Sequence, residues 1–144
     1  MLTLEKTVII DRPQQEVFDF VSDPANDARY RGGARSAEWS SEGPVGVGST
    51  MRSVDRFMGR DMETVSRITA WDPPHRYAFE TVGGPFPARY TLTFEPMGDG
   101  TRLTSRGEIG FKGIFRVVEW VFGGQIKAQA ETDFETLKGL LEGS

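Results

Sequence analysis

The fold is decided by residues 113–144, which read GIFRVVEWVFGGQIKAQAETDFETLKGLLEGS. From residue 125 onward, apolar side chains recur at steps of three and four residues, at Ile126, Ala130, Phe134, Leu137 and Leu141. This spacing is typical of an amphipathic helix that buries one face. We therefore expect a major C-terminal helix that packs on a sheet.

The first half of this segment carries an apolar stripe of its own, formed by Ile114, Val117, Val118 and Val121. In a straight helix this stripe points almost opposite to the later one, and Glu119 then falls on the buried face. Gly123 and Gly124 separate the two halves, and each glycine costs roughly 1 kcal/mol relative to alanine inside a helix. The sequence thus predicts a break or kink at these glycines, with Glu119 turned either to solvent or to the interior.

The composition is that of one soluble domain spanning residues 1–144. With 38% hydrophobic and 26% charged residues, a chain of this length buries roughly 70% of its extended surface. The 17 basic and 21 acidic residues are interspersed and give a formal net charge of -4, so no basic surface indicates nucleic acid binding. The absence of cysteine excludes a disulfide framework, a thiolate nucleophile and a sulfur-ligated metal.

The N-terminal residues do not resemble a targeting signal. Residues 1–6 lack a basic region followed by an apolar run, and no segment approaches 18 unbroken apolar residues. We therefore expect a cytoplasmic protein with no integral membrane segment.

Short elements precede the long helix. A β-branched run at residues 5–10 predicts a first strand, and residues 11–14 (DRPQ) supply a capping aspartate, a first-turn proline and a glutamine three positions on. A helix should begin there. Residues 23–24 (DP) should end it and cap a second short helix over residues 25–30.

After residue 33 the apolar period changes to two. Strands are predicted at residues 36–41, 48–57, 60–71, 77–81, 88–95 and 101–110. Their connections are too short for parallel crossovers, so the seven-stranded sheet should be antiparallel. A ten-residue strand spans roughly 33 Å and a 28-residue helix roughly 42 Å, so one helix can lie across the concave side of such a sheet. The fold class is α+β.

Two stretches carry a resemblance to a known family. They are TVIIDRPQQEVFDFVSD at residues 7–23 and ITAWDPPHRY at residues 68–77. With the long final helix, they resemble the polyketide cyclase/dehydrase and lipid-transport family of the START-like (SRPBCC, Bet v 1-like) superfamily. The resemblance covers nearly the whole chain and implies a helix-grip fold with a deep, mostly apolar cavity between sheet and helix. Members include aromatases, cyclases, lipid and hormone carriers, co-chaperone domains and ring-hydroxylase subunits, so the fold does not choose a function.

Eight large or adaptable side chains are candidates for the ligand-binding cavity. They are Trp39, Met51, Met62, Phe79, Tyr90, Phe111, Trp120 and Phe122. Methionine and aromatic side chains suit an apolar pocket of irregular shape, although each of them could equally fill a core. The family resemblance favours a pocket, on the order of 300 to 1,000 Å³.

Few residues suggest catalysis. His75 is the only histidine and lies in a turn, and no metal-spaced cluster, nucleophile elbow or phosphate loop is present, so we expect no metal and no cofactor. Glu119 could be an acid–base group if it is buried in the pocket, with Tyr90 as a second, orienting candidate. The alternative for Glu119 is a surface ion pair with Arg116.

Polar residues gather where the second short helix ends. In the family this region lies near the cavity mouth, and the residues concerned are Arg29, Tyr30, Arg31 and Arg35. The arginines could steer an anionic head group or could simply form a solvated rim. Along the strand at residues 48–57 we expect Arg52, Asp55 and Arg56 to point mostly outward.

Three functions fit the sequence. The first is binding of a small hydrophobic or amphipathic, lipid- or polyketide-like molecule, as a carrier, sensor or storage protein. The second is a polyketide aromatase/cyclase or dehydratase that uses Glu119 and Tyr90. The third is an interaction module that presents residues 114–122 to a membrane or a protein partner.

Overall fold

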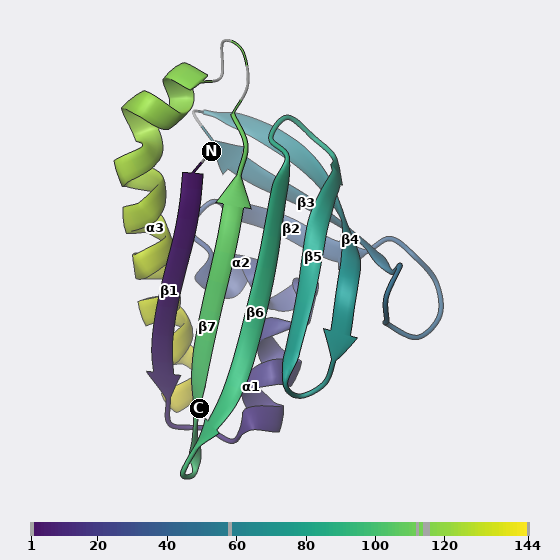
Figure 1. The fold of residues 1–144 in the computed structure, drawn as a ribbon, viewed down its shortest axis with the longest axis vertical. Coiled ribbons are helices and arrows are strands. Elements are labelled where there is room, and N and C mark those ends of the chain that lie inside the picture. The colour runs from purple at the N-terminus through teal and green to yellow at the C-terminus, as the bar shows by residue number, and fades with distance from the viewer. Residues whose placement is uncertain (1, 58, 112, 114–115, 144) are drawn as a thin grey trace.

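The computed structural model describes residues 2–57, 59–111, 113 and 116–143. Its sheet has seven antiparallel strands in the order β1-β7-β6-β5-β4-β3-β2. The strands are β1 (Leu2–Ile10), β2 (Ala34–Trp39), β3 (Thr50–Phe57), β4 (Arg60–Asp72), β5 (Arg76–Gly83), β6 (Ala88–Met97) and β7 (Gly100–Ile109). The sheet curls, so that β2 and β3 lie behind β5 and β6, and the long helix α3 (Arg116–Glu142) runs beside β1 (Figure 1).

All seven predicted strands are confirmed, with ends that shift by at most three residues. The largest shift is at β1, which begins at Leu2 because it pairs with β7 from the Leu2–Ile109 register onward. Period-two alternation places one face of each strand inside: on β6, Leu92 and Phe94 are buried while Thr91 and Glu95 are exposed.

The short helices are α1 (Gln14–Val21), the 3₁₀ helix η1 (Pro24–Asn26) and α2 (Asp27–Tyr30). The predicted cap at Asp11 is wrong, since the N-cap of α1 is Pro13 and makes no side-chain cap. Asp11 instead donates its backbone N–H to Glu142 Oε2 at 2.8 Å. The second cap is confirmed, because the Asp23 carboxylate accepts the Ala25 N–H at 3.0 Å.

α3 is one continuous helix across Gly123 and Gly124. The chain is therefore not broken at the glycines, and of the two predicted alternatives only a kink within the helix stays a prediction. Its buried residues are Val118, Gly123, Leu137 and Leu141, which form one stripe in the register of the second half. The separate first-half stripe is therefore wrong, apart from Val118. Its other described members, Val117 and Val121, are 59% and 53% exposed, and Ile114 lies outside the described residues.

The core consists of two clusters. The first gathers α1, the sheet and the last turns of α3, around Phe18, whose ring meets Trp71, Tyr77 and Phe94 at centroid distances of 5.1 to 5.7 Å. The second lies around the N-terminal half of α3 and has Leu2, Phe111 and Val118 as its buried members. Edge-to-face aromatic contacts of this kind add to the stabilisation from area burial.

The last turn of α3 is fastened to the end of β1. Arg12 donates from Nε to the Leu141 carbonyl at 2.7 Å and from Nη2 to the Glu142 carbonyl at 3.3 Å. Lys138 Nζ donates to the Ile9 carbonyl and, at 2.8 Å, to Glu142 Oε2. Cationic donors at a helix C-terminus satisfy carbonyls that have no partner within the helix.

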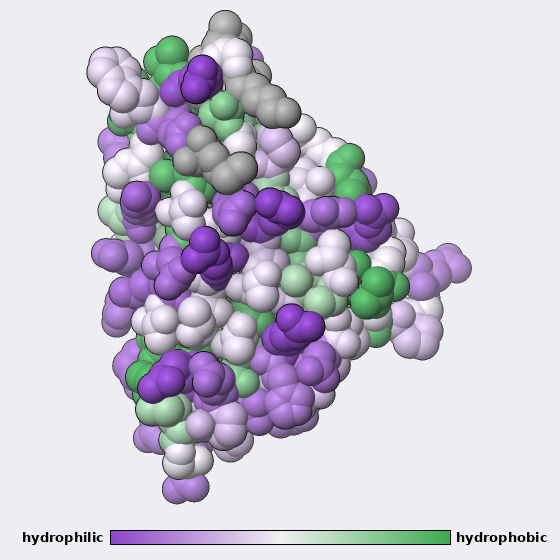
Figure 2. Space-filling model, in the orientation of Figure 1, coloured by the Kyte–Doolittle hydropathy of each residue, from purple (hydrophilic) through white to green (hydrophobic). Residues whose placement is uncertain are grey.

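The outer face of the sheet is mainly hydrophilic (Figure 2). Cross-strand ion pairs lie there, such as Arg67 with Glu80 at 2.7 Å and Arg106 with Glu5 at 2.9 Å. Exposed pairs of this kind contribute little to stability. None of the helices in the described part of the chain is long and apolar enough to cross a membrane.

Candidate functional site

A cavity of about 1010 Å³ lies between the inner face of the sheet and α3. Its lining includes Tyr77 and Phe134 from the first core cluster and Phe111 and Ile126 from the second. The cavity therefore separates the two clusters. Its volume lies at the upper end of the roughly 300 to 1,000 Å³ typical of small-molecule sites.

Six of the eight predicted cavity residues line this space, namely Met51, Met62, Phe79, Tyr90, Phe111 and Phe122. The other two do not. Trp39 packs edge-on against Trp71 at 6.4 Å beside the first cluster, and Trp120 is 87% exposed. Trp120 points outward because the stripe through Val118 and Phe122 faces the protein.

Stacked aromatic rings form part of the cavity wall on β5 and β6. Tyr77 and Phe79 lie 6.1 Å apart with an interplanar angle of 20°, and Phe79 and Tyr90 lie 5.3 Å apart at 22°. Tyr90 pairs with Gly107 across β6 and β7, where a β-carbon on the glycine would lie 2.2 Å from Tyr90 Cε1. The missing side chain therefore lets the tyrosine ring lie down on the sheet.

Phenylalanines line the opposite part of the cavity. Phe57 meets Phe86 at 6.2 Å and Phe122 at 6.3 Å, and Phe86 meets Phe111 at 5.1 Å. They come from β3, the β5–β6 and β7–α3 connections, and α3. Segments far apart in the sequence thus present one apolar surface to the cavity.

The polar part of the cavity is built around Arg31, at the end of α2. Its Nη1 donates to Asp27 Oδ2 at 3.0 Å and its Nη2 to Asp55 Oδ1 at 2.8 Å. All three side chains line the cavity. The expectation that Asp55 points outward is wrong, because Met51, Ser53, Asp55 and Phe57 alternate onto the inner face of β3. The period of two along this strand is present in the sequence, but the charge of Asp55 led to the expectation of an outward side chain.

Burial sets the protonation of the polar groups around the cavity. It raises the pKa of Asp27 above its ordinary value, against the opposing effect of Arg31. It also raises the pKa of Tyr30, Tyr77 and Tyr90, so these phenols keep their protons at neutral pH. Tyr77 donates its hydroxyl to the Val21 carbonyl at 3.2 Å.

The predicted mouth residues divide into two pairs. Tyr30 and Arg31 line the cavity. Arg29 instead lies on the other side of α2, with its guanidinium 5.0 Å from the centroid of the Phe20 ring, and Arg35 is exposed on β2. A cluster of free arginines at the mouth is therefore not formed.

Neither Glu119 nor His75 lies in the cavity wall. Glu119 is half-buried on α3 and is not among the residues that line the cavity. The ion pairs between described residues do not include one between Arg116 and Glu119. His75 is exposed, as expected, with Nδ1 3.4 Å from Gln14 Nε2. Among the residues described, no three His, Cys, Asp or Glu side chains could hold a metal ion together.

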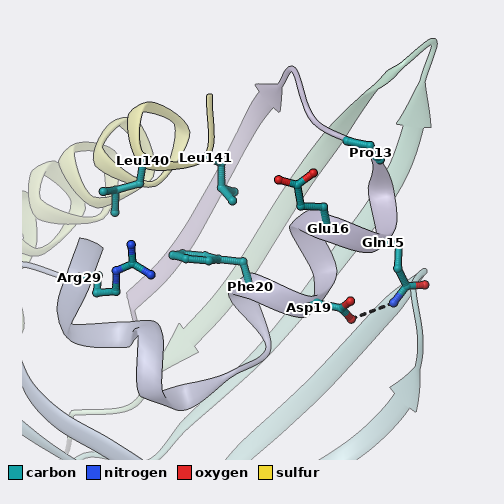
Figure 3. Close-up of a pocket in the computed structure, with 8 residues that line it drawn as sticks. All are labelled: Pro13, Gln15, Glu16, Asp19, Phe20, Arg29, Leu140 and Leu141. Carbon is teal, nitrogen blue, oxygen red and sulfur yellow. Dashed lines mark hydrogen bonds between the residues drawn. The ribbon is translucent and has the colours of Figure 1, made fainter. Parts of the chain in front are cut away.

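A second pocket lies outside the core, where α1 and α2 meet the end of α3 (Figure 3). Glu16 projects from α1 toward Leu141, and Phe20 and Arg29 lie opposite Leu140, whereas Asp19 points toward Gln15. Asp19 accepts a hydrogen bond from Gln15 Nε2 at 2.8 Å. The pocket has neither the stacked rings nor the inward-facing polar cluster of the large cavity.

The sequence matches the family described as "Polyketide cyclase / dehydrase and lipid transport" over residues 1–142. An uncharacterized protein of Mycobacterium tuberculosis is 31% identical over 119 residues, covering 80% of this chain and 81% of its own.

Solved structures share the fold. A START superfamily protein from Mycobacterium smegmatis superposes with a TM-score of 0.75 at 18% identity, covering 99% of this chain and 96% of its own. The Zhui aromatase/cyclase from Streptomyces sp. R1128 has a TM-score of 0.73 at 17% identity, with 97% and 93% covered. At these identities the likeness establishes the fold alone.

Proposed function

Because the chain belongs to the polyketide cyclase/dehydrase and lipid transport family, we propose that it binds a small hydrophobic or amphipathic molecule between the sheet and α3. It would act in the cytoplasm as a carrier or sensor. The observation that carries this proposal is the cavity of about 1010 Å³. Its stacked rings and phenylalanines supply apolar contact area, and the Arg31 cluster supplies a few convergent polar groups, as in known small-molecule sites.

A passive binder fits the site better than an acid–base enzyme. Glu119, the carboxylate expected to act, does not line the cavity. Tyr90 does line it, but burial raises its pKa, which makes the phenol a weaker acid and leaves no phenolate to act as a base at neutral pH. Tyr90 can donate a hydrogen bond to a ligand.

Native mass spectrometry of the protein purified from its own host tests the proposal. We expect a co-purifying small molecule, and binding of N-phenyl-1-naphthylamine, an uncharged probe that fluoresces in apolar surroundings, once this molecule is removed.

Matched variants on α3 locate the binding. Ala130 lines the cavity, whereas Ala128 is exposed on the same helix. Ala130→Phe should fill part of the space and weaken probe binding, and Ala128→Phe should not. Equal effects of the two variants, or no probe binding to the wild type, would contradict a cavity binder.

One observation supports the interaction module as a second candidate. Val117, Trp120 and Val121 form an exposed apolar patch on α3, with Trp120 87% exposed. Exposed apolar patches often mark interaction surfaces. If the cavity binds nothing, Trp120→Ser should be tested for loss of association with vesicles or with a second copy of the chain.

A further inference from the structure

The Arg31 cluster, defined as Asp27, Arg31 and Asp55, is the polar end of the cavity. Both carboxylates are within 3.0 Å of the guanidinium. The side chains of the cluster are 18% to 35% exposed, and all three line the cavity. A ligand that fills the cavity therefore meets this cluster.

The sign of the cluster's charge decides what it can hold. One guanidinium and two carboxylates sum to -1, and protonation of one carboxyl brings the sum only to zero. Arg31 stays cationic: burial by itself would lower the pKa of the guanidinium, but the two aspartates beside it outweigh that effect and raise the pKa above its ordinary value. With at most one of the two carboxyls protonated the cluster is not positive, and a carboxylate or phosphate on a ligand would then meet no uncompensated positive charge.

Two tyrosines complete the surroundings. Tyr30 and Tyr90 both line the cavity, and neither hydroxyl has a hydrogen-bond partner within the described ranges. Each can donate to an oxygen of the ligand and accept from its O–H. The carboxylate oxygens of the cluster accept only.

The remaining charges around the cavity do not change its sign. The basic side chains are Lys6, Arg56 and Lys127, and the acidic ones are Glu5, Glu131 and Asp133. Three positive and three negative groups sum to zero. The selectivity of the polar end therefore rests on the Arg31 cluster.

From this geometry we propose that the Arg31 cluster and the two tyrosines hold the hydroxyl end of an uncharged ligand and exclude a carboxylate end. A hydroxyl donates to an aspartate oxygen and accepts from a tyrosine or from Arg31, so it satisfies both kinds of neighbour. The stacked rings of Tyr77, Phe79 and Tyr90 suit a flat, apolar ligand body. This inference rests on the proposed function and reverses the expectation that arginines steer an anion here.

The test compares two ligands of one shape. Bound N-phenyl-1-naphthylamine is displaced either by 2-naphthol, which is uncharged at neutral pH, or by 2-naphthoate, which is an anion. We expect the naphthol to displace the probe at a concentration lower by about tenfold or more, as one unfavourable charge contact implies.

Asp55→Asn removes one negative charge and keeps an acceptor for Arg31, so it should reduce the preference for naphthol by about tenfold. The control is Glu80→Gln, which removes the same charge from an exposed pair with Arg67 outside the cavity and should leave the preference unchanged. If Asp55→Asn does not fold, Asp27→Asn makes the same test.

The outcomes separate the two proposals. If the probe binds but naphthoate competes as well as naphthol, or if Asp55→Asn and Glu80→Gln behave alike, the hydroxyl site is wrong and the cavity binder stands. If the probe does not bind to the wild type at all, the proposed function itself fails.

Discussion

At the residue scale, the Tyr90–Gly107 pair shapes the cavity wall. The tyrosine ring occupies the place where a side chain at position 107 would stand, and Tyr90 Cε1 would lie 2.2 Å from an added β-carbon. A ring cannot move aside as easily as the end of a flexible chain. Gly107→Ala should therefore displace Tyr90 and cost about 1–3 kcal/mol, as overpacking does elsewhere.

A double-mutant cycle measured by urea unfolding checks this prediction. In a Tyr90→Ala background the cost of Gly107→Ala should largely disappear, because the clashing ring is gone. If the two substitutions were additive, the close approach of the ring would not be what requires glycine at position 107.

Asp27 should give the stability of the molecule a pH dependence. Burial raises the pKa of its carboxyl above 3.8 in the folded protein, so between that value and the raised pKa the folded state holds a proton that the unfolded state has lost. Stability from this group is full below pH 3.8 and is lost as the pH rises through the folded-state value.

The measurement is the free energy of unfolding of the wild type minus that of Asp27→Asn, followed with pH. We expect this difference to fall as the pH rises above 3.8 and then to level off. A difference that rises with pH would mean that the ion pair with Arg31 outweighs the burial of Asp27.

Residue types in the sequence identify most of the cavity wall but not its polar end. Met51, Met62 and Phe79 were identifiable because large apolar side chains on an alternating strand turn inward. Asp55 has the same phase as Met51, yet a charged residue is expected outside. Its inward position depends on Arg31, which comes from a helix whose placement the strand pattern does not specify.

At the element scale, α3 shows where local periodicity is insufficient. Its first half has apolar residues on two sides, and local spacing cannot tell which side is buried. The buried side is the one that carries Val118 and Phe122, because it packs in the cluster of Leu2 and Phe111. The strands were predictable because short turns and a period of two leave one antiparallel arrangement.

Because α3 is continuous, Gly123 and Gly124 should each lower the stability of the helix, and this can be tested. An added β-carbon at Gly124 would meet nothing within 4 Å, and one at Gly123 would lie 3.8 Å from Leu2 Cδ1, an ordinary contact. Gly124→Ala should stabilise the protein by about 1 kcal/mol, the difference in helix propensity.

Thermal or urea unfolding of Gly124→Ala measures this gain, with Gly43→Ala as the contrasting variant. Gly43 is also unobstructed but has a φ of 86°, so alanine there should destabilise. A loss of stability in Gly124→Ala would show that α3 needs flexibility at that point.

At the scale of the whole molecule, the cavity exists because the two core clusters lie apart. Aromatic residues and methionines are equally suited to filling a core and to lining a cavity. Their presence in the sequence therefore predicts apolar surroundings but does not predict a cavity. The prediction of a cavity came from the family resemblance. The physical cause of the cavity is the curl of the sheet around α3. The ligand's polar chemistry follows only from side chains that the folded chain brings together.

The strand order also determines how the chain can associate with other chains. β1 and β2 are the two edges of the sheet, and exposed edges invite another chain to add a strand. The helix α3 lies alongside β1, and Lys138 Nζ donates a hydrogen bond to the Ile9 carbonyl. At β2 the strand is only six residues long and presents the exposed charges of Arg35 and Glu38. Strand-by-strand growth into larger β-assemblies is thus discouraged at both edges, and self-association would have to use side-chain surfaces.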